Sequence, residues 1–350
     1  MRVTGQPASA ARLRIEVEVW RGSIPESRHR IQAAVVDAGG NLVAATEAPD
    51  LVTSFRSSAK PFQLLPLVER GHAERWGFSP EDLAIMAASH TGSPYHLARV
   101  KQILARLGVG EKALACGYHD PVDPESLDHV QTHPEERSAL YNNCSGKHAG
   151  MLAQALAEGW PLEGYEHPDH PLQRRVRETV AELCGVAPES LSLGIDGCSV
   201  CVFGAPLQAM ARAYAKFAAA RAGGDARERA LERIRSAMME FPVATGGGRR
   251  FSTQLMIAAD GTLVAKGGAE GLECMGVPAR GFGIALKCED GRSRGVGPAV
   301  VALLRHLGLL SEEQAERLEP WRRPLLRNAA GVVVGEIRAQ VVEVLAGVTA

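Results

Sequence analysis

Strand-like patterns gather at the two ends of this 350-residue chain, and helical patterns fill the stretch between them. Residues 12–20 alternate apolar and polar side chains as a half-buried strand does, and residues 29–46 predict a hairpin around an Ala-Gly-Gly-Asn turn. Late in the chain, residues 251–268 predict two strands around an Asp-Gly turn, and further strands are expected within 281–295 and 331–345. We therefore expect a sheet whose strands come from both ends of the chain.

Helical spacing of apolar residues dominates the middle of the chain, most clearly at residues 94–108, 145–159 and 171–185. Strands and helices that segregate in this way predict an α+β fold rather than a regular alternation of strand and helix. We expect one catalytic unit over residues 1–350, in which an antiparallel sheet lobe (about 1–75 and 241–350) flanks a helical lobe (about 76–240).

Composition excludes several classes of protein. The net charge of −1 gives no electrostatic footprint for nucleic acid or for an anionic membrane. No apolar run approaches the roughly 20 residues that a membrane-spanning helix needs, and the first residues lack the apolar core of a secretion signal, so a cytoplasmic location is expected. The seven cysteines are odd in number, which argues against a disulfide framework and favours metal binding or plain burial.

Lysine is scarce, because only seven of the 39 basic residues are lysine and the others are arginine. Arginine stays protonated, whereas lysine can lose its proton when it is buried or crowded by positive charge. Ser57 and Lys60 stand three residues apart, on one face of a helix, where a lysine of lowered pKa can take the proton of a serine nucleophile. The Ser-x-x-Lys motif is short, so a solvated helix start is the alternative.

Two further stretches place residues of catalytic type beside buried elements. Ser89 and His90 follow an apolar helix, where they either line the floor of a pocket or cap the helix. Lys266 ends a strand and precedes two glycines, which let a ligand approach the backbone closely. A lysine at such a strand end, facing a helix with Ser-x-x-Lys, is a known catalytic layout, and a solvated edge lysine is the alternative.

Two cysteine-bearing stretches suggest metal or thiol chemistry. Cys144 and Lys147 share a face at the start of a helix, where free backbone N–H groups suit an anion such as a carboxylate. Asp196 precedes Cys198 and Cys201, a Cys-x-x-Cys pair that indicates half of a zinc site or a redox pair. The sequence offers no second Cys-x-x-Cys to complete a structural zinc site.

Together these stretches resemble the bacterial asparaginase II family, also described as class 3 or thermolabile-type asparaginases. The motifs RG…ES.H, RSSAKPFQ, ASHTGS, NNCSGKHAGM, HPDHP, DGCS, AKGGAEG and LKCEDG occur in the order of that family. The resemblance runs from about Val19 to about Gly308, which is most of the chain. Motifs of this length are far more specific than a single Ser-x-x-Lys.

The resemblance implies a fold like that of penicillin-recognising hydrolases and SxxK-type glutaminases. It also implies hydrolysis of L-asparagine to L-aspartate and ammonia by two Ser–Lys pairs, Ser57 with Lys60 and Ser89 with Lys266. In the mechanism we expect, Ser57 attacks the side-chain amide with Lys60 as base, and water hydrolyses the resulting acyl-enzyme. Ser89 and Lys266 relay protons and position the substrate.

The resemblance also implies a metal, substrate contacts and an assembly. One zinc ion per chain maps to Cys144, Lys147 and Cys198, where it orients the substrate. Cys201 departs from that pattern, because it can compete for zinc or pair oxidatively with Cys198. A homodimer is the expected assembly. Substrate-binding residues are expected at Arg56, His90, Asn143, His148 and Asp196.

Three other interpretations compete with the asparaginase. An SxxK-type glutaminase differs only by one methylene in its substrate. A non-catalytic protein that binds amino acids or peptidoglycan fragments on the same fold is disfavoured by the intact Ser57, Lys60 and Lys266. A β-lactamase-like hydrolase is disfavoured because the Lys-Gly-Gly-Ala at 266–269 differs from the Lys-Thr-Gly of that class.

Overall fold

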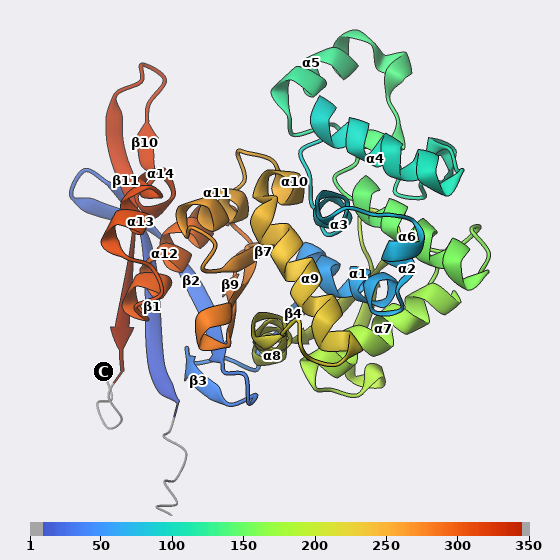
Figure 1. Ribbon diagram of the computed structural model, residues 1–350. Helices are drawn as coiled ribbons and strands as arrows, with labels where there is room; N and C mark the ends of the chain where they lie inside the picture. The colour runs from blue at the N-terminus through green and yellow to red at the C-terminus, as the bar shows by residue number, and fades with distance from the viewer. Residues whose placement is uncertain (1–9, 345–350) are drawn as a thin grey trace, which may run out of the picture.

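The computed structural model describes residues 10–344, in which an eight-stranded sheet stands beside a group of helices (Figure 1). The strand order is β10-β11-β1-β3-β2-β9-β8-β7, and a small second sheet has the order β4-β6-β5. The strands are β1 (Ala11–Arg21), β2 (Ile24–Val36), β3 (Leu42–Ala45), β4 (Val52–Ser54), β5 (Ser192–Ile195), β6 (Cys201–Pro206), β7 (Val264–Gly268), β8 (Leu272–Val277), β9 (Phe282–Cys288), β10 (Leu325–Arg327) and β11 (Val333–Glu343).

The large sheet draws on both ends of the chain, as the alternating patterns predict. β1 pairs antiparallel with β11, so that Leu13 lies opposite Glu343, and β2 joins β1 on the N-terminal side to β9 on the C-terminal side. Only the short contact between β1 and β3 is parallel among the pairings of the described residues. The predicted α+β class is confirmed.

Helices supply the rest of the described chain, and none of them is both long and apolar enough to cross a membrane. The α-helices are α1 (Lys60–Glu69), α2 (His72–Arg75), α3 (Pro80–Met86), α4 (Pro94–Leu107), α5 (Pro124–Thr132), α6 (Ser145–Glu158), α7 (Pro171–Cys184), α8 (Leu207–Ala219), α9 (Ala226–Glu240), α10 (Pro242–Gly246), α11 (Phe251–Ala258), α12 (Val296–His306), α13 (Glu312–Glu316) and α14 (Glu319–Arg322). The 3₁₀ turns are η1 (Arg56–Ala59), η2 (Glu111–Ala113), η3 (Pro134–Glu136), η4 (Ala139–Tyr141), η5 (Pro188–Ser190), η6 (Pro278–Arg280) and η7 (Ser293–Gly295).

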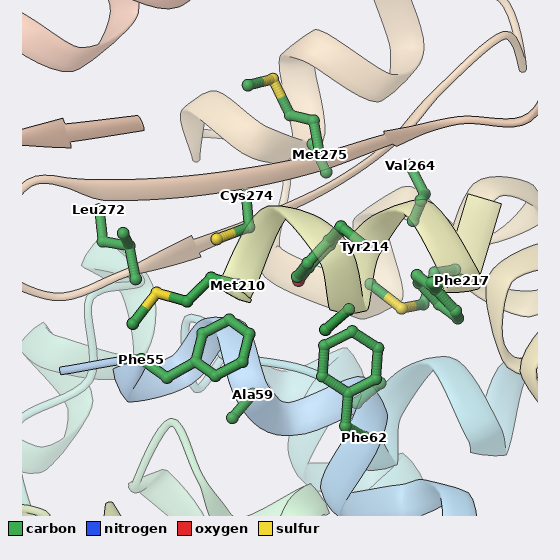
Figure 2. Close-up of a cluster of buried hydrophobic side chains, with 14 of the residues drawn as sticks. Phe55, Ala59, Phe62, Met210, Tyr214, Phe217, Val264, Leu272, Cys274 and Met275 are labelled. Carbon is green, nitrogen blue, oxygen red and sulfur yellow. The ribbon is translucent and has the colours of Figure 1, made fainter. Parts of the chain in front are cut away.

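Helix α8 packs on one face of the large sheet, α11 packs against the edge strand β7, and α12 packs against β11, β1 and β9. α8 packs across β2, β8 and β9, closely enough that a Cβ on Gly283 would lie 2.0 Å from the carbonyl oxygen of Ala211. In β8, Cys274 points toward α8 in Figure 2, whereas its neighbour Glu273 accepts a hydrogen bond from Ser252 of α11 at 2.7 Å. Successive strand residues face opposite sides, so α8 and α11 sandwich β8.

An aromatic core between α8 and α1 fixes the start of α1 against the sheet (Figure 2). The ring of Phe62 lies 5.2 Å from that of Tyr214, edge to face, and both side chains are fully buried. The Tyr214 hydroxyl donates to the carbonyl of Ser58 at 2.8 Å, and the Ser58 hydroxyl donates to the carbonyl of Lys266 at 2.7 Å. The turn that carries Ser57 is therefore tied to β7 through buried hydrogen bonds.

Two local predictions differ from the structure. Residues 251–258 form helix α11 instead of a strand, and only the second half of the predicted hairpin is a strand, namely β7. The stretch is apolar enough for either state, and in the structure it buries Thr253, Leu255 and Met256 as a helix packed against β7. The small sheet of β4, β5 and β6 lies within and beside the stretch predicted to be helical, and the sequence patterns did not indicate it.

Candidate active site

A cavity of about 700 Å³ opens between the end of β7, the start of α11 and the turn that precedes α1. Four of the predicted site residues line it, namely Ser57, Ser89, Asn143 and Lys266. Lys60 lies behind this wall with 1% of its surface exposed. The structure therefore brings together four chain segments that are remote in sequence.

Ser57 lies in η1, directly after a residue with strained backbone. Arg56 has a φ of 44°, the left-handed region that side chains other than glycine rarely adopt. The Arg56 guanidinium pairs with Asp196 at 3.0 Å, which links the turn before α1 to the segment that precedes Cys198. Such strain persists only where surrounding contacts hold it, and it is concentrated at functional sites.

We call Ser57, Lys60, Ser89 and Lys266 the Ser–Lys cluster. The Lys60 ammonium donates to Ser89 Oγ at 2.9 Å, to the carbonyl of Ala88 at 2.6 Å and to that of Asn143 at 3.4 Å. The Lys266 ammonium donates to the same Ser89 Oγ at 2.8 Å. The hydroxyl that two lysines share is thus that of Ser89, and Lys60 makes no hydrogen bond to Ser57 within the described residues.

Burial lowers the pKa of both lysines in this cluster. For Lys266 the loss of hydration is the largest cause, and the charges of Lys60 and Arg250 lower the pKa further, to well below its usual value. For Lys60 burial is again the first cause, partly opposed by the charge of Cys144. Like charges that are buried together disfavour protonation, so these amines are suited to accept a proton.

We call Cys144, Lys147 and Cys198 the Cys–Lys cluster. The Lys147 amine lies 2.9 Å from the sulfur of Cys198, and the three side chains are buried. A hydrogen bond from Cys198 lowers the pKa of Cys144 well below the usual thiol value, which makes Cys144 the thiolate of the pair. Burial lowers the pKa of Lys147, but the charges of the two sulfurs outweigh it and raise that pKa above its usual value.

Cys201, two residues beyond Ser199, starts strand β6 and is buried. It makes no disulfide, and all seven cysteines of the chain are free thiols. Burial raises the pKa of the Cys201 thiol, unlike that of Cys144. A buried thiol whose pKa is raised is chemically inert, so its environment does not mark Cys201 as a reactive or redox-active cysteine.

The two predicted histidines lie behind the cavity wall. His90 is fully buried; its Nδ1 accepts from the backbone of Gly92 at 3.1 Å, and its Nε2 lies 2.9 Å from Ser145 Oγ. His148 contacts the hydroxyl of Tyr165 through Nδ1, and its buried Nε2 has no hydrogen-bond partner among the described residues. Burial lowers the pKa of both imidazoles well below the usual value, so both are neutral.

Three cavity residues carry charge or hydrogen bonds that the sequence analysis did not mention. Arg250, Ser252 and Glu273 line the cavity beside Lys266. Burial raises the pKa of Glu273 to about 7, and the Ser252 hydroxyl that donates to it also accepts from the backbone of Gly267 at 2.9 Å. The glycine run at 246–248, which two arginines follow, is the signal in the sequence that could have found this region.

A second group of metal-capable side chains is formed by His29, Cys288 and Asp290. His29 Nδ1 lies 2.7 Å from Asp290, and Arg294 donates to His29 Nε2 at 2.9 Å. Because arginine is always a donor, the imidazole carries its hydrogen on Nδ1 and has no lone pair left for a metal. Two of the recognised motifs, RG…ES.H and LKCEDG, therefore meet in a hydrogen-bonded network that ties β2 to the end of β9.

Comparison with known families identifies the chain. The sequence pattern of the family described as L-asparaginase II matches residues 17–339, and the chain belongs to that family. No curated protein matches the sequence.

Among solved structures, the chain is similar to a crystal structure of Mglu in its glutamate form, with a TM-score of 0.46 and 16% sequence identity over 80% of this chain and 61% of the Mglu chain. A structure of Mglu in its native form gives a TM-score of 0.44, with 16% identity over 80% of this chain and 62% of the other. The chain thus spans less than two thirds of these two Mglu chains.

Proposed function

We propose that the protein hydrolyses L-asparagine to L-aspartate and ammonia with a serine nucleophile that a lysine activates. The observation that carries the proposal is Ser89 Oγ, which two buried lysines share at 2.9 and 2.8 Å in the cavity that Ser57 also lines. The L-asparaginase II family of the chain supports an amide substrate.

In the proposed reaction, Ser57 Oγ attacks the carbon of the side-chain amide and forms a C–O bond, while the Lys60 amine accepts the serine proton. Lys60 follows Ser57 by one turn, and in this reaction it exchanges its longest hydrogen bond, 3.4 Å to the carbonyl of Asn143, for one to Ser57. The C–N bond then breaks, and the proton passes from Lys60 through Ser89 to the departing nitrogen, with Lys266 holding the Ser89 hydroxyl. Water hydrolyses the acyl ester by the reverse proton path.

The negative charge that develops on the amide oxygen during the attack is stabilised by hydrogen bonds from backbone N–H groups. The N–H of Ser57 lies in the first turn of η1, where a helix offers no carbonyl partner for it. The end of β7 passes close by, since a Cβ on Gly268 would lie 3.2 Å from the carbonyl of Phe55. We assign the oxyanion site to the N–H of Ser57 and the backbone at the end of β7.

The Cys–Lys cluster has the donor set for one zinc ion. Cysteine sulfurs bind zinc, and the neutral amine of Lys147, 2.9 Å from the sulfur of Cys198, would complete the set of protein donors. An ion held there would supply a positive charge that orients the substrate beside the Ser–Lys cluster, and Cys144 would provide the thiolate.

A side-by-side assay of ammonia release from L-asparagine and L-glutamine tests the proposal. Turnover of L-asparagine that exceeds turnover of L-glutamine supports it. The reverse preference supports the glutaminase alternative, since one methylene changes the free energy of binding by only about 1–3 kcal/mol. Binding of either amino acid without ammonia release supports a non-catalytic binding protein.

Assembly as a homodimer and a cytoplasmic location stay predictions. Size-exclusion chromatography tests the first, and cell fractionation tests the second.

A further inference from the structure

One guanidinium in the cavity lacks a partner of its own. Arg250 lines the cavity, and its buried Nε makes no hydrogen bond to any residue between 10 and 344. Arg294 of the same cavity donates to His29, and Arg249, which also lines the cavity, is exposed to solvent. A half-buried cation whose Nε is shielded from water and has no partner is costly, so this position suits an anion that arrives from outside the chain.

Backbone contacts fix the position of the segment that carries Arg250 relative to the Ser–Lys cluster. The carbonyl of Thr245 accepts a hydrogen bond from the backbone N–H of Ser89 at 3.1 Å. The glycine turn that follows packs against the same segment: Gly247 has a φ of 86°, and a Cβ there would lie 2.6 Å from Thr91 Cγ2. Only glycine allows this approach, after which the chain delivers Arg250 to the cavity wall.

The chemistry of the substrate supplies one anionic group. An amino-acid amide such as asparagine carries its α-carboxylate as the single negative charge, at the opposite end from the amide that Ser57 attacks. The planar guanidinium of arginine matches a carboxylate with two parallel hydrogen bonds. Lys60 and Lys266 point their ammonium groups at Ser89 instead, so they are committed to the reacting end.

We propose that Arg250 binds the α-carboxylate of the amino-acid amide and so selects free amino acids over amides that lack this group. The inference rests on the proposed amidohydrolase function and names the substrate class of that site. Arg250 touches the substrate at a distance from the reacting atoms, which makes it a specificity-determining residue.

The test compares two substrates that differ only in the carboxylate, L-asparagine and 3-aminopropanamide. In Arg250→Gln, kcat/KM for L-asparagine should fall about 10- to 100-fold, mainly through KM, as expected for loss of a charged hydrogen-bonded pair. The value for 3-aminopropanamide should change little, so discrimination between the two collapses. If loss of Arg250 changes the pKa of Lys266, kcat/KM changes equally for both substrates. This effect therefore cancels in the ratio of the two kcat/KM values. Arg250→Lys should keep part of the discrimination.

Arg249→Gln is the matched control, because this neighbouring arginine lines the same cavity but is exposed to solvent, so its loss should leave discrimination intact. Thermal unfolding checks that each variant is folded, and if the glutamine variant unfolds, Arg250→Lys decides alone. Unchanged discrimination in the Arg250 variants, or its loss in Arg249→Gln instead, overturns the inference.

Calorimetric binding of L-aspartate and of β-alanine separates this inference from the proposed function. If the protein hydrolyses neither amide but binds L-aspartate more tightly than β-alanine through Arg250, the proposed function fails and the inference stands. If it hydrolyses L-asparagine while Arg250→Gln keeps full discrimination, the inference fails and the function stands. A wild-type protein that neither binds L-aspartate nor releases ammonia overturns both.

Discussion

The Ser–Lys and Cys–Lys clusters bury their lysines to nearly the same depth, yet they shift the pKa values in opposite directions. Lys60, Lys266 and Lys147 have 1%, 3% and 4% of their surface exposed. Burial lowers the pKa of Lys60 and Lys266, which donate to hydroxyl and carbonyl oxygens, although the charges of Cys144 and Cys198 partly oppose the shift at Lys60. Beside Lys147 the sulfur charges outweigh burial and raise the pKa.

The difference teaches that neighbouring charge, and not depth, decides what a buried lysine can do. An amine surrounded by hydroxyl and carbonyl groups loses its proton readily and can serve as a base. An amine close to a thiolate charge, as Lys147 is to that of Cys144, keeps its proton until a metal cation replaces that proton. The first arrangement suits proton transfer, and the second suits a metal ion that takes the place of the proton.

The largest expected effect comes from removing the nucleophile. Ser57→Ala should lower kcat at least about 10⁴-fold, because no other group can form the acyl ester. Ser89→Ala should also be slow, since it removes the hydroxyl that both lysines share, but it should still acylate Ser57. Mass spectrometry of acid-quenched protein locates the acyl group. An adduct on Ser89 in the wild type would assign the attack to the shared hydroxyl and reverse the roles of the two serines.

Exchange of the base for a fixed cation comes next. Lys60→Arg should lower kcat about 10³-fold, nearly as much as Lys60→Ala, because a guanidinium keeps the charge but cannot accept a proton. Steady-state ammonia release measures both variants. If Lys60→Arg stays well active, Lys60 supplies only positive charge, and the contrast with Lys147 disappears.

Metal content tests the Cys–Lys cluster, the second of the two clusters compared. Protein purified without chelator should carry about one zinc per chain, and Cys144→Ser should lose most of it, whereas Cys201→Ser should keep it. Zinc affinity should fall as pH falls, because protons then compete for the two sulfurs and for Lys147, whose pKa is raised. Elemental analysis measures the zinc content of the wild type and of both variants. Zinc that survives Cys144→Ser but vanishes in Cys201→Ser belongs to the Cys-x-x-Cys pair instead.

The smallest expected effect is a shift of the pH profile. The neutral lysines are the active form, so kcat/KM should be lost as pH falls through the pKa values of Lys60 and Lys266, at midpoints below the usual lysine value of about 10.4. The charge of Glu273 raises the pKa of Lys266, so Glu273→Gln should move the Lys266 midpoint to lower pH, by less than about one unit. Glu270→Gln, an exposed carboxylate on the same cavity, is the control. A shift to higher pH in Glu273→Gln would contradict the assignment.

Local periodicity predicted much of the fold. The predicted hairpin at 29–46 is β2 and β3, and the helices predicted at 94–108, 145–159 and 171–185 are α4, α6 and α7. These elements have clear apolar spacing over many residues, which is the strongest signal a sequence offers. Residues 251–258 lack such spacing, and contacts with β7 decide that they form a helix.

Spacing in the sequence related site residues only where they are neighbours, and the family resemblance supplied the remote ones, such as Ser89 and Lys266. Ser57 and Lys60 belong to one turn, so their spacing was enough to relate them. Glu273 reaches the site because β8 pairs with β7, with Glu273 opposite Gly267, and Arg250 reaches it through the glycine turn that packs on Thr91. The identity of neither residue indicates which distant strand or segment will pack beside it.

The antiparallel pairing of β1 with β11 has a consequence for synthesis on the ribosome. Leu13 leaves the exit tunnel long before its partner Glu343, which follows only after all the other described strands have been made. Until then one edge of β1 is unpaired and open to strands of other nascent chains. The sheet therefore closes only after translation has passed the last strand.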